Sequence, residues 1–516
     1  MRTLVVKWWA ASLLLSLSIG GSASPAAAAG GPRVTYEGPT GTVAGPVTLT
    51  AEAHGGGARI AAVTFLVDGA PRGSDTTSPY SLGLNPALIR GGRHTVRVIA
   101  VDNLGRRASS PVAALVTKGA GDPPVEASPA AGLPAALRAL RRGDVTVRLA
   151  PGRYSLDNVV LGTSARLVGS GPGTVISPSN PGYFAILVAK GEHIRIANLT
   201  VDGGGAGRGG GNAIAVFDGS RDVRLQRLRL RHVRQNGVNV WGAYSEVSVQ
   251  DSVIDGGGTG NAGVFSLGSD KSRNTSVIRT RISGFRSYGI LLGQKEYGRP
   301  SAALHDLALD NVISDIRDPA RNACYTSPSA PRCGTEEGGI WTGGVAAAII
   351  GNTILRARWD GIETVGSSTR TTVVDNVVRG TRTGIYLEHA TNDSTIARNV
   401  VSGSPAGINV EWWYGGVGSR ENTFSDNRIV GARRAGIFVG VGSDGNRIAR
   451  NVFVDGQRPA IQLQGSSGNR VQGNRGCGNG AALVGESTGR RDDGTVATPR
   501  RNLLVDNASY ATCRGH

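Results

Sequence analysis

The sequence predicts an all-β protein in which a right-handed parallel β-helix follows a small antiparallel β-sandwich. The β-helix is predicted by a repeat, a Gly-Ile-x-φ-x segment (φ, apolar) followed farther along by φ-x-x-Asn-x-φ. Most repeats start 22 to 29 residues apart, and one gap of 50 holds an insert. Short repeats rich in Val, Ile and Gly, without helical periodicity, are typical of a solenoid of parallel strands. The repeats start at Ala213, Gly237, Gly263, Gly289, Gly339, Gly361, Gly384, Gly407, Gly436 and Ala460.

The second half of the repeat places an Asn at an equivalent point in most coils. The repeat resembles that of the right-handed parallel β-helix superfamily of pectate lyases, polygalacturonases and related polysaccharide-active proteins. The resemblance implies that these Asn side chains stack at a tight turn between strands. It implies little about the reaction, since this fold hosts lyases, hydrolases, epimerases and non-enzymes. The positions are Asn198, Asn311, Asn352, Asn376, Asn399, Asn427, Asn451 and Asn474, with Arg227, Asp251 and Thr280 where Asn is absent.

The β-helix is expected to span residues 133–484. Leu133 to Arg142 reads as an amphipathic helix that resembles the cap covering the open end of such solenoids. Residues 119–132 are rich in Pro, Gly and Ala, which is typical of a linker. Residues 485–516 are expected to form a polar tail that a disulfide ties to the last coil.

Residues 32–118 contain short alternating strands separated by Gly, Pro and Ser turns, which indicates a small β-sandwich. The segments VTFLVDG and GRHTVRVIAVDNLG resemble the bacterial immunoglobulin-like modules of secreted enzymes. We expect this domain to act as a spacer, with weak carbohydrate or cell-wall binding as the alternative.

Residues 1–29 have the layout of a secretory signal peptide, with Arg2 and Lys7, an apolar run, and Ala27 to Ala29 before Gly30. No other stretch is long and apolar enough to span a bilayer. The protein is therefore expected to be secreted. The formal charge is +18, and Arg provides most of the basic side chains. Such a surface suits an anionic polymer, although dispersed Arg also fits a composition bias. No nucleic-acid-binding motif is present.

Four cysteines in an exported chain predict disulfides. Four cysteines allow three connectivities, and proximity in the sequence favours Cys324 with Cys333 and Cys477 with Cys513. The first pair would close the insert, and the second would tether the tail. Their spacing does not match a zinc site.

Strand alternation turns the repeat into a map of one face. The Ile and φ residues are expected to point into the core, so the x positions point outward. Outward carboxylates are confined to three consecutive coils, at Glu363, Glu388 and Glu411, with Asp360 and His389 at strand ends. Like charges on neighbouring rungs repel and raise a pKa. We therefore predict that these five residues supply the catalytic groups. The alternative is that the acids are ordinary solvated residues of the surface.

Aromatic and amide side chains flank the carboxylates and suggest sugar subsites. An exposed indole stacks on a sugar ring while its N–H reaches a hydroxyl. Asn409 would bind a sugar hydroxyl, and Tyr386 would hold a catalytic carboxylate or act as an acid. The substrate-binding candidates are Trp341, Tyr386, Asn409, Trp412 and Trp413.

These residues predict a secreted polysaccharide-active enzyme, with a glycoside hydrolase favoured and no cofactor required. Glu388 and Glu411 would stand about 5 Å apart, and Glu363 and Glu388 roughly 8 Å apart, so spacing leaves retention or inversion open; the family's hydrolases favour inversion. One alternative is a uronate lyase or C5-epimerase whose carboxylates hold Ca²⁺, which the lack of a clear Lys or Arg on these rungs weighs against. A second is a non-catalytic surface or adhesion protein. Any metal site, the polymer and the oligomeric state are left open.

Overall fold

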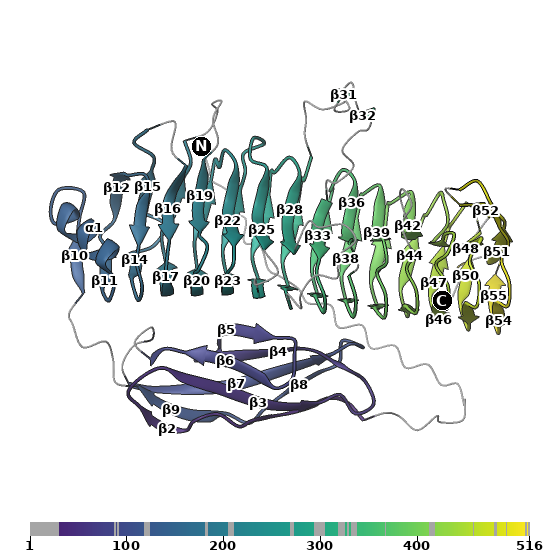
Figure 1. The fold of residues 1–516 in the computed structure, drawn as a ribbon, viewed down its shortest axis with the longest axis horizontal. Helices are drawn as coiled ribbons and strands as arrows, with labels where there is room; N and C mark the ends of the chain where they lie inside the picture. Colours follow the sequence, from purple (N-terminus) through teal and green to yellow (C-terminus); the bar gives the residue numbers. More distant parts are fainter. Residues whose placement is uncertain are drawn as a thin grey trace, which may run out of the picture.

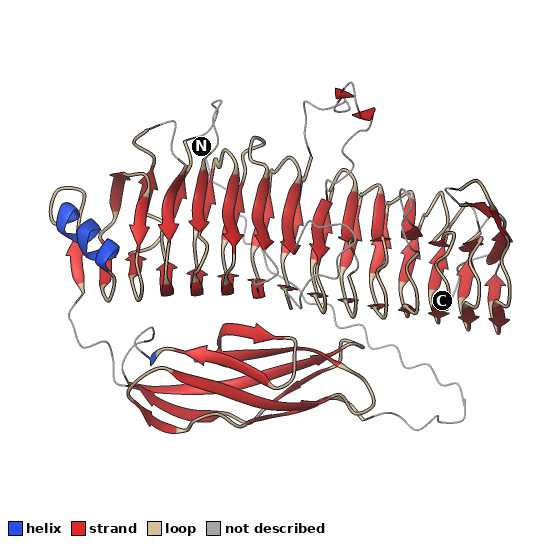
Figure 2. Cartoon of the chain, in the orientation of Figure 1, coloured by secondary structure: helices blue, strands red, loops and turns tan. Residues whose placement is uncertain are grey.

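The computed structural model contains two β domains that lie side by side (Figures 1 and 2). It describes residues 30–86, 89, 92–117, 124–180, 184–204, 211–268, 273–293, 305–317, 326–327, 330–331, 338–366, 368–411, 418–457, 459–478, 482–491, 493–510 and 513. The predicted signal segment, Trp412, Trp413, Cys324 and Cys333 lie outside these residues. In the described part of the chain, no helix is long and apolar enough to cross a membrane.

The N-terminal domain is a sandwich of a three-stranded sheet, in the order β1-β3-β6, and a larger sheet, in the order β2-β9-β7-β4-β5 with β8 beside β7. Alternating residues such as Val63, Phe65 and Val67 face a common apolar core. The predicted β-sandwich is therefore confirmed. Its strands are β1 (Arg33–Tyr36), β2 (Gly41–Val43), β3 (Val47–His54), β4 (Ile60–Val67), β5 (Ala70–Asp75), β6 (Tyr80–Leu84), β7 (Gly92–Asp102), β8 (Arg107–Ser109) and β9 (Ala113–Thr117).

The C-terminal domain is the predicted β-helix, built from three long parallel sheets of 15, 14 and 13 strands. Helix α1 (Leu133–Arg142) covers its first coil and buries Ala136, Ala139 and Leu140. Strand β10 already pairs with β11, so the β-helix begins inside the segment predicted as a linker. The 15-stranded sheet comprises β10 (Val125–Ala127), β11 (Thr146–Leu149), β14 (Arg166–Gly169), β17 (Glu192–Ala197), β20 (Arg221–Gln226), β23 (Ser245–Gln250), β26 (Arg273–Ile278), β29 (Leu307–Leu309), β34 (Ala348–Ile350), β37 (Thr372–Val374), β40 (Thr395–Ala397), β43 (Thr423–Ser425), β46 (Arg447–Ala449), β49 (Arg470–Gln472) and β54 (Leu503–Val505).

The 14-stranded sheet follows the Asn turns. The segment predicted as a tail contributes strands to all three sheets, and Cys477 and Cys513 form the predicted disulfide there. The sheet comprises β12 (Gly152–Ser155), β15 (Thr174–Ser177), β18 (Thr200–Asp202), β21 (Arg229–Arg231), β24 (Val253–Asp255), β27 (Arg281–Ser283), β30 (Val312–Ser314), β35 (Thr353–Leu355), β38 (Val377–Arg379), β41 (Val400–Ser402), β44 (Arg428–Val430), β47 (Val452–Val454), β50 (Arg475–Cys477) and β55 (Ala508–Tyr510).

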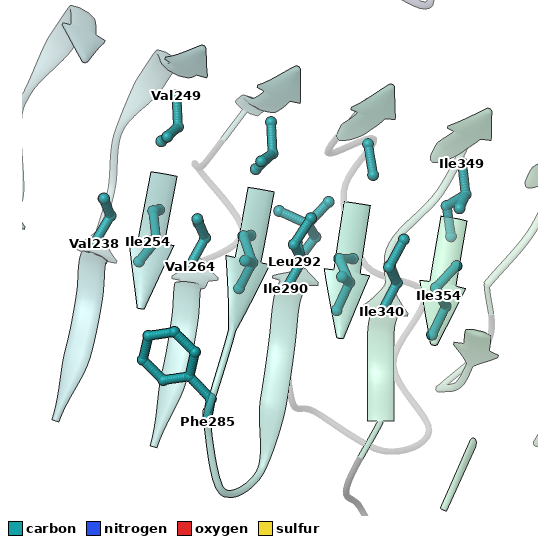
Figure 3. Close-up of a cluster of buried hydrophobic side chains, with 14 of the residues drawn as sticks. Val238, Val249, Ile254, Val264, Phe285, Ile290, Leu292, Ile340, Ile349 and Ile354 are labelled. Carbon is teal, nitrogen blue, oxygen red and sulfur yellow. The ribbon is translucent and has the colours of Figure 1, made fainter. Parts of the chain in front are cut away.

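The 13-stranded sheet carries the Gly-Ile segments, and their Ile side chains stack inside the solenoid (Figure 3). Ile340, Ile362, Ile385, Ile408 and Ile437 are all fully buried, as predicted. The sheet comprises β13 (Val159–Leu161), β16 (Ala185–Ala189), β19 (Asn212–Val216), β22 (Asn236–Gly242), β25 (Ala262–Gly268), β28 (Tyr288–Gly293), β33 (Gly338–Gly343), β36 (Asp360–Thr364), β39 (Thr383–Glu388), β42 (Ala406–Glu411), β45 (Ile437–Val439), β48 (Ile461–Gln464) and β51 (Val484–Ser487). Two short hairpins, β31 (Thr326–Ser327) with β32 (Ala330–Pro331) and β52 (Gly489–Arg490) with β53 (Val496–Ala497), stand outside the sheets.

The predicted Asn ladder runs from Asn311 to Asn474 and continues to Asn507. Each Asn side chain donates to the Oδ1 atom of the next, as between Asn376 and Asn399 (3.0 Å). The prediction is wrong by one residue in the early coils. Asn198, Arg227 and Asp251 precede the ladder position and adopt left-handed φ angles of 56°, 51° and 50°. Asn and Asp tolerate that conformation, which is why the two neighbouring positions look alike in the sequence.

A second Asn ladder, which the repeat analysis missed, supports the turns that enter the 15-stranded sheet. Asn422 donates through Nδ2 to Oδ1 of Asn446 (3.1 Å), and Asn446 donates to Asn469 (3.2 Å). The coils from Asn422 onward are therefore held at two corners by buried amides whose polar atoms are paired, as buried polar groups require.

The β-sandwich packs along the outer face of the 15-stranded sheet. Ala61, Ala62 and Val101 contact apolar side chains of that sheet in one buried cluster. Arg59 Nη2 donates to the backbone oxygen of Arg370 (2.9 Å). The first domain is therefore docked on the β-helix. The β-helix side of the cluster comprises Ile278, Leu307, Leu309, Ala348, Ile350, Val374 and Ala397.

Candidate active site

The predicted outward columns exist on the 13-stranded sheet. Strand pairing places Tyr386 beside Glu363 on one side and Asn409 on the other. Glu388 is paired directly with Glu411 in the second column. The carboxylates come together because the Gly-Ile register, fixed by the buried Ile stack, leaves their positions on the outer face.

A cavity of about 810 Å³ lies on this face at the predicted carboxylate coils. Six predicted site residues line it: Asp360, Glu363, Tyr386, Glu388, Asn409 and Glu411. The other lining residues are Trp359, Arg382, Thr383, Ala406, Arg433, Arg434, Ala435, Phe438, Pro459, Gln462, Gln464, Gly485, Glu486 and Ser487.

The Glu388 carboxylate contacts the imidazole of its neighbour His389. The distance from Glu388 Oε1 to His389 Nε2 is 3.1 Å, and both side chains are largely buried. His389 and Ala390 both adopt left-handed φ angles, 45° and 56°, so the chain turns sharply after the strand. This turn brings the imidazole back to the carboxylate. His389 contacts Glu388 and does not line the cavity.

Glu411 is oriented by an amide from its own strand. Asn409 Nδ2 donates to Glu411 Oε1 over 2.8 Å. Burial raises the pKa of Glu411, and the charge of Glu388 raises it further, while Asn409, Arg434 and Arg382 lower it. The rise dominates because burial removes water from the charged form.

Asp360 is a carboxyl group of the cavity whose pKa is strongly raised. Burial raises the pKa of Asp360 to about 7, and the charges of Glu388 and Glu411 add to the rise. A hydrogen bond from Thr383 and the charge of Arg382 act in the opposite direction. The cavity therefore contains a carboxyl group that exchanges its proton near neutral pH.

Tyr386 presents a phenol between the carboxylates. Its hydroxyl is buried and has no hydrogen-bond partner among the described residues. Burial raises the pKa of Tyr386, and the charges of Glu388 and Glu411 raise it further. The phenol therefore stays protonated at neutral pH and can donate a hydrogen bond to a molecule in the cavity.

Two sequence predictions for this face need correction. Trp341 was expected to stack on a sugar, but its side chain is 1% exposed and lies in an apolar cluster with Tyr288 and Leu291. Leu291 is its paired neighbour, so the indole meets an apolar outer surface that alternation alone does not reveal. Glu363 lines the cavity but is 2% exposed, whereas the sequence placed it in an open groove.

The cations and two aromatic residues of the cavity were not among the predicted site residues. Trp359, Arg382 and Arg434 stand two positions before the Gly of their repeats, just outside the strand positions that alternation addresses. Arg382 lies over the Trp359 ring, 4.4 Å from its centroid, as a cation–π pair. The expectation that no Arg accompanies the carboxylate rungs is therefore wrong.

Metal ligation has no candidate among the residues that the structure describes. No three His, Cys, Asp or Glu side chains of that set are placed so that they could share one ion. Glu388 and Glu411 are adjacent, but the third ligand is missing from the described part of the chain.

Two family models match the chain. A bacterial Ig domain model matches residues 32–98. A model described as periplasmic copper-binding protein (NosD) matches residues 321–513. The sulfur donors of the described residues do not fit copper(I). Copper(I) prefers thiolate and thioether ligands, whereas the only methionine is Met1 and the two described cysteines are joined in a disulfide.

No curated protein matches the sequence. Similar solved structures include a mannuronan C-5 epimerase module from Azotobacter vinelandii (14% identity, 73% of this chain, 93% of that chain, TM-score 0.43). They also include a family 6 polysaccharide lyase from Pseudopedobacter saltans (11%, 75%, 92%, 0.47) and a GH87 α-1,3-glucanase from Streptomyces thermodiastaticus (15%, 90%, 89%, 0.44). The stacked parallel sheets and the two family matches identify the chain as a right-handed parallel β-helix protein with an N-terminal bacterial immunoglobulin-like domain.

Proposed function

We propose that this protein is an exported polysaccharide-active enzyme, specifically a glycoside hydrolase. The observation that supports this proposal is that Asp360, Glu388 and Glu411 share one cavity while their surroundings differ. Carboxyl groups in different environments can serve as acid and base at the same pH. Paired carboxyl groups of this kind are the usual catalytic groups of glycosidases.

Asp360 acts as the general acid in this proposal. With a pKa of about 7, it carries a proton at and below neutral pH. It transfers that proton to the glycosidic oxygen as the bond to the leaving sugar breaks. Burial keeps Asp360 protonated near neutral pH, so the proton is available for this transfer.

Glu388 acts as the base that takes a proton from the attacking water. His389 holds one of its oxygens at 3.1 Å and thereby fixes the direction of the carboxylate. Glu411, fixed by Asn409, places negative charge where the sugar ring develops positive charge. His389 and Asn409 are positioning residues, since each acts through a neighbouring carboxylate.

Substrate is held by the aromatic and polar groups around the carboxylates. Trp359 and Phe438 offer ring faces to the apolar side of a pyranose. Tyr386 offers a hydroxyl that can donate to a sugar oxygen. Export agrees with the disulfide between Cys477 and Cys513, because such bonds persist in oxidising compartments.

A glycan panel with products read by mass tests the proposal. Hydrolysis adds one water to each product pair, and the wild-type protein should yield such products from at least one polymer. Glu388→Gln should abolish them, and Glu421→Gln, an exposed acid of the same domain, should not. Products that lack the added water would overturn the hydrolase assignment, and no products from any polymer would favour a non-catalytic binding protein.

A second candidate, a uronate lyase or C5-epimerase, is favoured by one observation. Arg382, Arg433 and Arg434 line the cavity and can bind a uronate carboxylate. A carboxylate of the cavity would then take the C5 proton of the uronate, and Tyr386 would return a proton to that carbon in epimerisation or give one to the leaving oxygen in elimination. An unsaturated product that absorbs near-ultraviolet light, or an altered sugar without chain cleavage, would support it. Activity that is lost on chelation and restored by Ca²⁺ would add a metal to this alternative.

A further inference from the structure

Three aromatic side chains are exposed together near the N-terminal end of the 13-stranded sheet. Trp241 is 64% exposed, Phe184 46% and Phe217 36%. The Phe184 and Phe217 rings are tilted by 45°, with centroids 5.6 Å apart. With Asp218, the three rings line a surface hollow of about 390 Å³. These residues are called the aromatic hollow below.

The aromatic hollow lies on the same face of the β-helix as the carboxylate cavity. Phe184 precedes β16, Phe217 follows β19 and Trp241 lies in β22, which are neighbouring rungs (Figure 1). Phe217 and Trp241 occupy the outward column that later holds Glu388 and Glu411. Strand pairing separates Trp241 from Glu388 by five rung-to-rung steps, or roughly 24 Å at ~4.8 Å per step.

The hollow and the cavity are separate sites. Between them, Trp341 is 1% exposed and Val365 2% exposed, so these two described positions offer no aromatic surface to a ligand. Among the described residues, the aromatic surface is therefore interrupted at these two positions. One long polysaccharide can still contact both sites, since they share a face and a direction along the stacked coils.

The chemistry of the hollow fits a sugar ring. Exposed rings stack on the C–H face of a pyranose, and the Trp241 indole N–H can donate to a hydroxyl. Asp218 Oδ1 accepts the backbone N–H of Ala243 over 2.6 Å, which fixes an exposed carboxylate at the rim of the hollow. Such a carboxylate accepts hydrogen bonds from sugar hydroxyls. Flat rings beside a fixed acceptor suit a sugar better than a purely apolar partner.

We propose that the aromatic hollow is a non-catalytic binding site for pyranose units of a polysaccharide. It holds a distant part of the chain on which the carboxylate cavity acts. This inference rests on the proposed function for the identity of the polymer. Binding at the hollow itself is independent of catalysis, because no residue of the hollow lines the cavity.

The test compares Trp241→Ala and Phe217→Ala with Tyr510→Ala, which removes an exposed aromatic ring from β55 on another sheet. Binding is measured by the retardation of the intact protein in native gels that contain sodium alginate, polygalacturonate or xylan. Each protein also carries Glu388→Gln, so that no polymer is consumed. Trp241→Ala should weaken the affinity for the polymer, obtained from the retardation, about threefold to tenfold. This is the loss expected for one stacked ring. Tyr510→Ala should leave it unchanged.

A second measurement separates this site from the cavity. With Glu388 intact, Trp241→Ala should lower kcat/KM on the intact polymer and leave turnover of its trisaccharide unchanged. The inference would be overturned by equal losses of kcat/KM on both substrates or by undiminished retardation of Trp241→Ala. It would also be overturned if no gel retarded the parent protein, or if the protein formed a dimer that Trp241→Ala dissociates. If Glu388→Gln instead retains full activity, the proposed function fails while the binding result still stands.

Discussion

Glu388 and Glu411 are directly paired on neighbouring strands, so two carboxylates face the same cavity one rung apart. This arrangement costs stability, since like charges at this spacing repel and burial strengthens the repulsion. The fold maintains it through His389 on one carboxylate and Asn409 on the other. An arrangement of side chains that lowers the stability of the fold is typical of a functional site.

Replacing Glu388 with Gln should remove catalysis while preserving the fold. Loss of a general base lowers kcat by about 10² to 10⁴. The melting temperature should hold or rise slightly, because Glu411 and Asp360 lose a like-charged neighbour. Initial rates and thermal melts of Glu388→Gln and the control Glu421→Gln check this. Undiminished turnover in Glu388→Gln would contradict the assignment of this site.

Asp360 should make folding stability depend on pH. The folded state holds this proton up to about pH 7, whereas the group's ordinary pKa is 3.8. The folded state therefore binds more protons between these values, and stability falls as the pH rises through this window. Asp360→Asn removes the ionisation, so its stability relative to wild type should increase from pH 4 to pH 8, by up to about 4 kcal/mol. Urea unfolding at several pH values measures this difference, and a constant difference would argue against the raised pKa.

The same group should set the alkaline limb of activity. If Asp360 is the general acid, kcat/KM falls above about pH 7 as its proton is lost. A pH profile on the polymer identified by the glycan panel checks this. Activity that keeps rising to pH 9 would instead indicate that Asp360 acts as a base.

Asn399→Ala should destabilise the β-helix without affecting the cavity chemistry. The Asn399 side chain donates to Val373 and Asn427 and accepts from Asn376, and all these groups are buried. Truncation leaves buried polar atoms unpaired, at a cost of about 1 to 3 kcal/mol. Chemical denaturation of the intact chain measures the loss. A change within about 0.5 kcal/mol, the range for surface substitutions, would contradict the ladder's stabilising role.

Ala62→Glu should detach the β-sandwich from the β-helix. Ala62 is 2% exposed within the contact between the domains, where a new carboxylate has no partner. We expect a larger radius of gyration by small-angle X-ray scattering, with far-ultraviolet circular dichroism unchanged. Thr48→Glu, at an exposed position of β3, is the matched control and should remain compact. An unchanged radius in Ala62→Glu would show that the polar contacts alone hold the domains together.

Much of the fold could be predicted because its determinants are local and repeated. The repeat places an Ile inside and an Asn at a turn. A one-residue shift would bury the polar face, so the strand register can be predicted from a single sequence. The ladder position was predicted wrongly in the early coils for a related reason. Asn198 and Asp251 occupy the left-handed residue beside the ladder, and that conformation favours the same residue types.

The sequence by itself determined which side chains share a face, because alternation along a strand and stacking between coils are both periodic. These two periodicities are enough to bring Asp360, Glu388 and Glu411 to one place. Only the tertiary structure decided which outward residues are solvated. Trp341 is buried and Trp241 is exposed at outward positions of the same sheet, because burial depends on what packs over each rung rather than on the rung itself. The Arg side chains of the cavity depend on tertiary structure for the same reason, since they enter from the turns before the strands, where the repeat fixes no direction.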